Sequence, residues 1–397
     1  MFKNKQIVLG VCGGIAVYKG VELLRLLKKH GADVRVIMTQ NAQQFVCPMT
    51  FEVLSEQPVW ATLFGSRPDP SIRHISWAEE ADAVIIAPAT ANIIGKLAAG
   101  IADDALSTFL LAVTAPVIIC PAMNTHMYQS RQVQRNLETL RADGYHIIEP
   151  ASGKLACGTT GPGRLPEPEA LLDRARACLT PKDLAGKRVL VTAGPTREPI
   201  DPVRFVSNPS SGKMGFAVAR AAEYRGADVT LVTGPVTLTD PENVSVIRIS
   251  TARQMADAVF EHMDSVDIVI KTAAVSDYRP VDPAAHKIKK QQSEMVLNLT
   301  QNPDILKELG RRKTHQILVG FAAETQDLSE NAGKKLAAKN LDIIVGNLIG
   351  QPASGFETDT NKVTLFFKDG TVLPLPAMEK DEVANVLLDH VKGLRNE

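Results

Sequence analysis

The chain has 397 residues, of which 45% are hydrophobic and 22% charged, the balance of a globular protein with two or three domains. Its 44 basic residues cancel its 44 acidic ones, which argues against nucleic acid or an anionic membrane surface as a partner. No apolar run reaches the roughly 20 residues of a membrane-spanning helix, and the N-terminal apolar stretch is too short for a signal peptide. The five cysteines form no CxxC pair, which argues against a zinc knuckle or a disulfide framework and favours a cytoplasmic location.

The first predicted elements are a strand, a glycine turn, a helix and a second strand. The apolar run at residues 7–11 leads into Gly13 and Gly14, and apolar residues at helical spacing follow between residues 17 and 27. A second apolar run lies within residues 31–39. This order is typical of the opening βαβ unit of a parallel sheet, whose buried strands have continuous apolar sequences.

The same unit recurs in the second half of the chain. Residues 226–234 nearly copy residues 31–39, and an apolar run before Gly194 supplies the preceding strand. Thr180 and Pro181 begin a stretch with the composition of a domain boundary. We therefore predict an α/β protein with two doubly wound, three-layer domains of the Rossmann or flavodoxin type, residues 1–180 and 181–397, with mainly parallel sheets. Further strands are predicted at residues 83–87, 117–120, 268–271, 317–319 and 343–345.

Glycines that follow a first strand are typical of a phosphate site, because backbone N–H groups at a helix start can approach an anion. The first turn, Gly-Val-Cys-Gly-Gly, is not the GxGxxG of nicotinamide cofactor sites, and the second strand ends at Thr39 rather than at an acid. The second half lacks that acid too. The pattern argues against a nicotinamide dinucleotide, and glycines that serve only a tight turn are an alternative interpretation.

Three residues of the first half have side chains suited to catalysis. Asn124 follows the predicted strand 117–120, at the edge where α/β sheets bind ligands, although asparagine there is more often a turn or capping residue. His74 is a candidate acid or base, whereas a lone histidine is usually structural. Cys157 lies within residues 153–163, a stretch we expect to be too rich in glycine for regular structure, and a loop cysteine is a candidate proton donor or nucleophile.

Longer motifs extend over both halves. The first half closely resembles the flavin-dependent cysteine decarboxylases in the motifs CGGIAVYK, HISWA, APATAN, PAMN and ACG. The second half resembles phosphopantothenate–cysteine ligase in TAGPTREPIDPVRFVSNPSSGKMG, AAVSDYRP, KIKK and FAAET. The whole chain, in this order, resembles the bacterial bifunctional coenzyme A biosynthesis family.

For the first half, the resemblance implies an FMN-dependent decarboxylase of phosphopantothenoylcysteine. Gly13 and Gly14 would approach the FMN phosphate, and the ribityl chain and ring would lie along Thr39, Thr90, Asn92 and Ser107. His74 would assist oxidation of the substrate thiol, Asn124 would hold the substrate carboxylate, and Cys157 would donate a proton to the product. The family usually has serine where this chain has Cys12, so one phosphate contact is weakened because a thiol is a poorer donor.

For the second half, the resemblance implies that CTP and Mg²⁺ convert 4′-phosphopantothenate to an acyl-cytidylate, from which the amine of cysteine displaces CMP. Lys287 would serve formation of this intermediate, although a lysine cluster is otherwise usually a solvated face. Asn208 would serve its conversion, Arg204 would bind the substrate phosphate, and Asp277 would hold ribose or the metal. The implied CTP residues are Ser210, Ser211, Gly212, Ala273, Ala274, Asp277, Lys287, Pro303, Asp304, Ile305, Leu306, Phe321, Lys335 and Lys339.

The implied partners are the small molecules 4′-phosphopantothenate, cysteine and CTP, with trimeric flavin domains and dimeric ligase domains building a large homo-oligomer such as a dodecamer. Two alternatives are a flavin-dependent peptidyl-cysteine decarboxylase with an unrelated second domain, and a non-enzymatic flavoprotein regulator. The ligase motifs argue against the first. The second is disfavoured because such regulators carry acidic tails that this neutral chain lacks.

Overall fold

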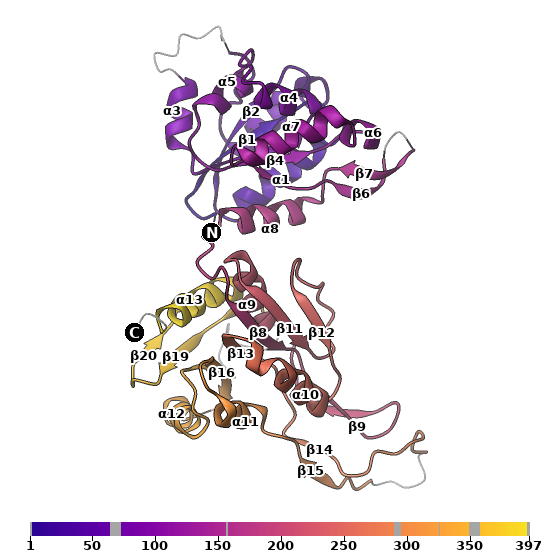
Figure 1. The fold of residues 1–397 in the computed structure, drawn as a ribbon, viewed down its shortest axis with the longest axis vertical. Helices are drawn as coiled ribbons and strands as arrows, with labels where there is room; N and C mark the ends of the chain where they lie inside the picture. The colour runs from indigo at the N-terminus through magenta and orange to yellow at the C-terminus, as the bar shows by residue number, and fades with distance from the viewer. Residues whose placement is uncertain are drawn as a thin grey trace. The chain divides into compact units, whose positions relative to one another are not determined.

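The computed structural model describes residues 2–63, 73–155, 158–289, 295–324, 326–348 and 358–394. The chain divides into two compact units, Met1–Thr180 and Pro181–Glu397 (Figure 1), and each is described by itself. Within the described ranges, no helix has the length and apolar character needed to span a membrane.

The first unit contains a five-stranded parallel sheet in the order β2-β1-β3-β4-β5. Its strands are β1 (Gln6–Val11), β2 (Asp33–Met38), β3 (Ala83–Ala89), β4 (Val117–Pro121) and β5 (His146–Ile147). The four strands predicted here are confirmed, and β5 has only two residues, too few for an apolar run. This is the flavodoxin-like order, with its switch point between β1 and β3.

Helices cover both faces of this sheet. On one face, Leu24 of α1 (Val17–Lys29) and Leu171 of α8 (Pro168–Leu179) pack with the strands. On the other, the core includes Ile94 of α4 (Ala91–Ala98) and Phe109 of α5 (Ala105–Ala112). The predicted three-layer arrangement is thus confirmed. The remaining helices are η1 (Ala42–Gln44), α2 (Pro48–Ser55), α3 (Arg73–Glu80), α6 (Thr125–Tyr128) and α7 (Arg131–Ala142).

The glycine-rich stretch 153–163 was expected to be irregular, and that expectation is wrong for its two ends. β6 (Ala151–Lys154) and β7 (Thr160–Arg164) pair antiparallel as a hairpin. Glycine permits a close approach here, because a Cβ at Gly163 would lie 2.2 Å from the carbonyl oxygen of Met123. The Met123 N–H donates to the Gly163 carbonyl at 3.0 Å, which attaches the hairpin to the loop after β4. Cys157 lies outside the described residues.

The second unit contains an eight-stranded sheet in the order β12-β11-β8-β13-β16-β17-β19-β20. Its parallel part has the Rossmann strand order, and the carboxyl ends of β8 and β13 flank the switch point. The predicted strands are confirmed, while parallel β12 and antiparallel β19 and β20 were not predicted. The strands are β8 (Arg188–Ala193), β11 (Asp228–Thr233), β12 (Ser245–Arg248), β13 (Ile268–Lys271), β16 (Ile317–Glu324), β17 (Ile343–Leu348), β19 (Val363–Phe367) and β20 (Val372–Pro374).

This sheet is also covered on both faces. Phe216 of α9 (Lys213–Tyr224) and Leu387 of α13 (Lys380–Gly393) belong to the core of one face. The other face packs against α10 (Ala252–His262), α11 (Ile305–Arg312) and α12 (Leu328–Ala338). Three short ribbons pair β9 (Arg197–Pro199) with β10 (Phe205–Ser207), β14 (Tyr278–Pro280) with β15 (Leu299–Gln301), and β18 (Thr360–Asn361) with β21 (Met378–Glu379); the remaining helix is η2 (Met263–Ser265).

Candidate functional site

Four predicted flavin residues and the predicted substrate residue Asn124 follow neighbouring parallel strands of the first unit. Thr39 follows β2, Gly13 and Gly14 follow β1, Thr90 follows β3, and Asn124 follows β4. Because these strands are adjacent in the order β2-β1-β3-β4, their carboxyl ends lie at one edge of the sheet. The structure therefore brings these residues to a common edge, at the switch point of the sheet.

The two glycines of the first turn have different surroundings. A Cβ at Gly13 would lie 2.5 Å from the Cβ of Asn41, so this glycine is needed for packing. A Cβ at Gly14 would meet nothing within 4 Å. The helix that follows, α1, has no capping side chain and no acidic residue in its first turn. Open space before an uncapped helix start is suited to an anion such as a phosphate.

Cys12 is part of the protein interior. The residue is 1% exposed, and its N–H donates to the Pro88 carbonyl at 3.2 Å. Burial raises the pKa of the thiol to about 12, although hydrogen bonds with Thr90 act in the opposite direction. Cys12 is therefore a neutral group that joins the first turn to the end of β3.

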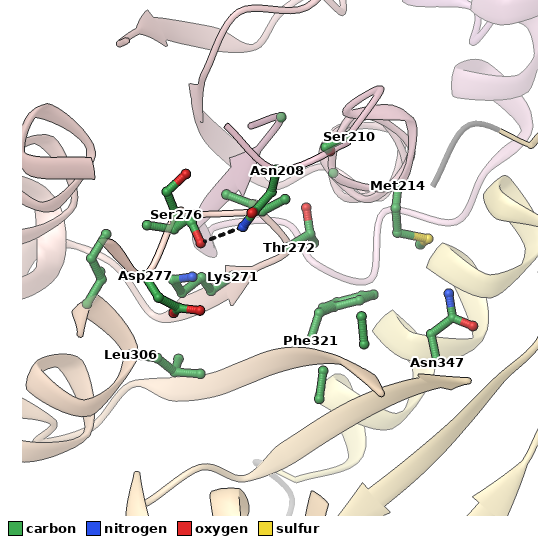
Figure 2. Close-up of a pocket in the computed structure, with 18 of the residues that line it drawn as sticks. Asn208, Ser210, Met214, Lys271, Thr272, Ser276, Asp277, Leu306, Phe321 and Asn347 are labelled. Atoms are coloured by element: carbon green, nitrogen blue, oxygen red, sulfur yellow. Dashed lines mark hydrogen bonds between the residues drawn. The ribbon is translucent and has the colours of Figure 1, made fainter. Parts of the chain in front are cut away.

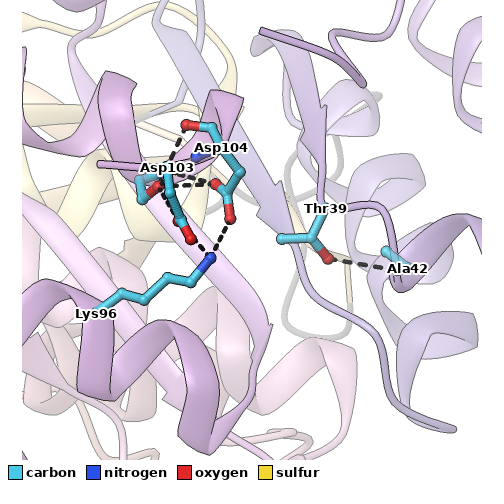
Figure 3. Close-up of polar contacts among 6 residues, drawn as sticks. Thr39, Ala42, Lys96, Asp103 and Asp104 are labelled. Atoms are coloured by element: carbon cyan, nitrogen blue, oxygen red, sulfur yellow. Dashed lines mark hydrogen bonds and ion pairs between the residues drawn. The ribbon is translucent and has the colours of Figure 1, made fainter. Parts of the chain in front are cut away.

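Ser107 has a capping role in this structure. It is fully buried, and its hydroxyl accepts from the Asp104 N–H at 3.1 Å while its own N–H donates to the Asp104 carboxylate at 2.8 Å. This reciprocal pair begins α5, and Lys96 forms ion pairs with Asp103 and Asp104 beside it (Figure 3). The expected contact of Ser107 with the flavin stays a prediction; in this structure its hydroxyl is enclosed and takes part in the helix cap.

Thr39, Thr90 and Asn92 remain accessible. The Thr39 hydroxyl accepts from the Ala42 N–H at 3.3 Å (Figure 3). Thr90 is the N-cap residue of α4 and makes no capping side-chain bond there, and Asn92 is exposed in the first turn of that helix. These polar groups therefore border the same sheet edge as the glycine turn.

Two of the three proposed catalytic residues of the first unit, Asn124 and His74, lie within the described residues. The Asn124 Oδ1 accepts from the His126 N–H at 2.8 Å, so it caps α6 while lying at the end of β4. The hairpin β6–β7, whose connection contains Cys157, is attached beside Asn124 at Met123. His74 lies in the first turn of α3, a half-buried position, and no described hydrogen bond joins it to Asn124.

The second unit contains a cavity of about 780 Å³ at the carboxyl ends of its central strands (Figure 2). Most of the predicted nucleotide residues line it, although they come from well-separated segments of the chain. These residues are Asn208, Ser210, Gly212, Ala273, Ala274, Asp277, Pro303, Asp304, Ile305, Leu306, Phe321, Lys335 and Lys339. Ser211, Arg204 and Lys287 are not among the lining residues.

The charged side chains that line this cavity are predominantly basic: two aspartates, Asp277 and Asp304, face the five lysines Lys213, Lys271, Lys335, Lys339 and Lys380. The Lys339 ammonium forms an ion pair with Asp304 at 2.9 Å, and Lys335 with Glu324 at 2.6 Å. The excess of positive charge suits a polyanionic ligand. Among the described residues, no group of three or more metal-binding side chains occurs.

Lys271, the last residue of β13, was not predicted as a site residue. Burial, together with the charge of Lys339, lowers the pKa of its ammonium to about 8, although Asp304 and Asp277 act in the opposite direction. Its signal in the sequence is a charged residue that ends an apolar strand, at the edge where ligands bind.

Asn208 lies where the loop before α9 approaches the loop after β13. Its Nδ2 donates to the Val275 carbonyl at 3.0 Å (Figure 2). In the same loop, the Ser210 hydroxyl accepts from the Gly212 N–H at 3.3 Å. Asn208 is therefore fixed at the cavity wall with its amide turned toward β13.

Lys287 and Arg204 belong to a segment fastened by Asp201. The Asp201 carboxylate accepts from the N–H groups of Val203 and Arg204, both at 2.8 Å, and of Ile288 at 3.1 Å. Burial alone would raise the pKa of Asp201, but these hydrogen bonds outweigh it and lower that pKa. The Arg204 side chain donates to the Ile288 carbonyl, and Lys287 itself is exposed. The structure thus holds Arg204 and Lys287 together, outside the cavity.

Comparison with known proteins supports this two-unit description. Residues 1–180 match the Flavoprotein family, and residues 184–394 match the family described as the DNA/pantothenate metabolism flavoprotein C-terminal domain. The chain is 52% identical, over 99% of its length and 98% of the relative, to the coenzyme A biosynthesis bifunctional protein CoaBC of Bacillus subtilis strain 168. The chain belongs to this family.

A second curated relative agrees with this membership. The protein of the same name from Escherichia coli K12 is 46% identical over 98% of this chain and 97% of the relative. A crystal structure of the C-terminal domain of a CoaBC protein aligns with a TM-score of 0.47 and 46% identity, covering 54% of this chain and 98% of that one. The chain is therefore a bifunctional enzyme of coenzyme A biosynthesis, as the sequence predicted, and the alternative with an unrelated second domain is excluded.

Proposed function

We propose that the two activities are divided between the two units. Residues 181–397 would join cysteine to 4′-phosphopantothenate with CTP and Mg²⁺, and residues 1–180 would decarboxylate the product with FMN. The observation that carries the proposal is the basic cavity of the second unit, in which five separate segments implied in CTP binding meet. Each unit also has its own core, as an independent activity requires.

The first unit fits FMN. The open turn at Gly14, before the uncapped start of α1 at Val17, would offer N–H donors to the phosphate, and Thr39, Thr90 and Asn92 would offer polar groups to the ribityl chain. Exposed apolar side chains in the segments after β1 and β2, Ile15 and Phe45, supply apolar surface beside this edge. When bound, FMN supplies the oxidation of the substrate thiol and the later return of its electrons.

The residues of this chain would supply the remaining steps of decarboxylation. The Asn124 amide would hold the substrate carboxylate, His74 would assist removal of the thiol proton, and Cys157 would donate a proton to the enethiolate carbon of the product. The attachment of the β6–β7 hairpin beside Asn124 supports a role for Cys157 near that carboxylate.

The cavity of the second unit fits a nucleoside triphosphate. Lysine ammonium groups would neutralise the phosphates, and the phosphopantothenate carboxylate would attack the α-phosphate, with pyrophosphate leaving. Magnesium bound to a triphosphate usually has only one or two protein carboxylates among its ligands. Asp277 and Asp304 both line the cavity, and we assign the metal or ribose contact to Asp277.

We further propose that the enzyme acts in the cytoplasm as a homo-oligomer, without nucleic acid or membrane as partners. Exposed apolar side chains on α1 and α2 of the first unit support a self-association surface: Tyr18, Met49 and Val53.

Lys271→Met should remove a pH dependence from CTP binding. With a pKa of about 8, the wild-type ammonium loses its proton as the pH rises through that value, and an anionic ligand favours the protonated form. Wild-type affinity for CTP should therefore fall about tenfold between about pH 7 and pH 9, with proton uptake on binding. Titration calorimetry in buffers of different ionisation enthalpy measures both. A matched control is Lys334→Met on the exposed face of α12; equal pH profiles for wild type and Lys271→Met would refute the assignment.

The proposed ligase function is tested by the nucleotide products. Incubation with 4′-phosphopantothenate, CTP and Mg²⁺ should release pyrophosphate. Addition of cysteine should then release one CMP for each amide bond formed. Release of pyrophosphate that does not depend on 4′-phosphopantothenate would contradict the proposal. For the first unit, FMN should be released on denaturation, in proportion to the protein.

A further inference from the structure

The cavity of the second unit extends beyond the predicted nucleotide residues. Five lining residues at one end have no assigned role: Lys213, Met214, Asn347, Asn361 and Lys380. They lie at the start of α9, the end of β17, in β18 and at the start of α13. In Figure 2, Met214 and Asn347 lie on one side of Phe321, while Asp277 and Leu306 lie on the other. We name these five residues the amino-acid end of the cavity.

This end is suited to a small anion. Lys380 is only 6% exposed although it lines the cavity, and its ammonium donates to the Thr358 carbonyl. Burial, followed by the charge of Lys213, lowers the pKa of Lys380, which indicates two neighbouring ammonium groups. Asp359 pairs with Lys213 at 2.7 Å, but its side chain is 78% exposed. The start of α9, with Gly212 as its N-cap, adds backbone N–H groups with neither a capping side chain nor an acidic residue in its first turn.

The same end also contains a hydrogen-bond acceptor in need of a donor. The Asn347 Oδ1 is buried and has no hydrogen-bond partner within the described structure. A fully ionised phosphate has only acceptor oxygens, so it would leave this atom unpaired. A ligand that presents both a carboxylate and an amine would satisfy the lysines and the Asn347 oxygen together.

We propose that the amino-acid end binds the free α-amino acid that the enzyme ligates, with Lys380, Lys213 and the start of α9 on its α-carboxylate and Asn347 Oδ1 on its α-amine. This rests on the proposed ligase function and adds the site of its third substrate. Met214 offers the substrate side chain a polarizable thioether contact.

The position of this end agrees with the chemistry. The amine nitrogen must form a bond to the acyl carbon of the acyl-cytidylate while the bond from that carbon to the phosphate oxygen breaks. The α-ammonium of the free amino acid first loses one proton to solvent. CMP leaves with the electron pair of the broken bond, and the second surplus proton of the amine then passes to solvent. In Figure 2, Asn208, assigned to this step, lies on the cavity wall between the Asp277 side and the Met214 side. An amine held by one N–H at Asn347 keeps its lone pair for the attack.

The test separates the two half-reactions of the full-length enzyme. Pyrophosphate release needs no amino acid, whereas amide formation does. Lys380→Met and Asn347→Leu should each raise the KM for cysteine at least tenfold, with the KM for CTP and single-turnover pyrophosphate release within twofold of wild type. Asn347→Asp keeps an acceptor oxygen and should restore most of the affinity lost in Asn347→Leu. Lys368→Met, a lysine beyond the cavity lining, is the matched control and should leave both KM values unchanged.

Other outcomes overturn the assignment. If the variants slow pyrophosphate release and raise the KM for CTP, the amino-acid end binds nucleotide phosphates instead. An unchanged KM for cysteine in Asn347→Leu also overturns it, and this variant decides the matter if Lys380→Met does not fold. Absence of pyrophosphate release from the wild type identifies failure of the proposed function itself, a result distinct from either of these.

Discussion

Replacing Lys287 with glutamine should slow formation of the acyl-cytidylate by about 10²–10³-fold, while FMN content and decarboxylation stay unchanged. Glutamine offers N–H donors in place of the ammonium and keeps much of the length, so the main loss is one positive charge. That charge matters most when the α-phosphate gains negative charge in the transition state, and removal of such a contact costs about 2.7–4 kcal/mol. The measurement is single-turnover release of pyrophosphate.

Two further variants make this result specific. Lys289→Gln removes a charge two residues away in the same exposed cluster and should have little effect. Asn208→Asp should release pyrophosphate but accumulate the cytidylate, because its defect lies in the later step. Lys287 is not among the residues that line the cavity. To act on the α-phosphate, its segment would have to approach the bound nucleotide, from the same chain or from a second copy. If Lys287→Gln releases pyrophosphate at the wild-type rate, the lysine cluster is only a solvent-exposed surface and has no role in this step.

Cys157→Ser should stall the decarboxylase late and leave the ligase intact. A serine hydroxyl is a much weaker acid than a thiol, and loss of a general acid typically costs about 10²–10⁴-fold in rate. Oxidation and loss of CO₂ precede this proton transfer, so a decarboxylated enethiol should accumulate while the flavin absorbance stays bleached. Mass spectrometry and visible absorbance measure the two effects.

A second cysteine of the same unit provides the control. Cys47 is a free, exposed cysteine, and Cys47→Ser should decarboxylate at the native rate. If Cys157→Ser also turns over at the native rate, Cys157 is a structural residue of the hairpin connection and the proton donor lies elsewhere.

The fold was predictable where local sequence and burial agree. Buried parallel strands are continuous apolar runs, so β1, β8 and their neighbours could be recognised without tertiary information. The two-residue β5 is too short for such a signal. The hairpin β6–β7 was missed because glycines normally weaken strands, whereas Gly163 is required there by the neighbouring backbone at Met123.

The residues of the candidate sites were predictable only where they lie within recognisable sequence motifs. The resemblance identified most of the nucleotide cavity, but it did not indicate Lys271, Asn347 or Lys380, whose proximity depends on which strand and helix ends meet. The capping role of Ser107 did have a local signal, because Asp104 three residues earlier is at the spacing of a capping box. The position of Lys287 depends on Asp201, which fastens a distant segment and has no sequence signature.

If this single chain performs both steps in order, mass spectrometry should show it in the products that the full-length enzyme makes from 4′-phosphopantothenate, cysteine, CTP and Mg²⁺. We expect 4′-phosphopantetheine, CMP, pyrophosphate and CO₂ in equal amounts, and no product when CTP or cysteine is omitted. Accumulation of phosphopantothenoylcysteine without decarboxylation by the FMN-loaded enzyme, or product formation without CTP, would contradict it.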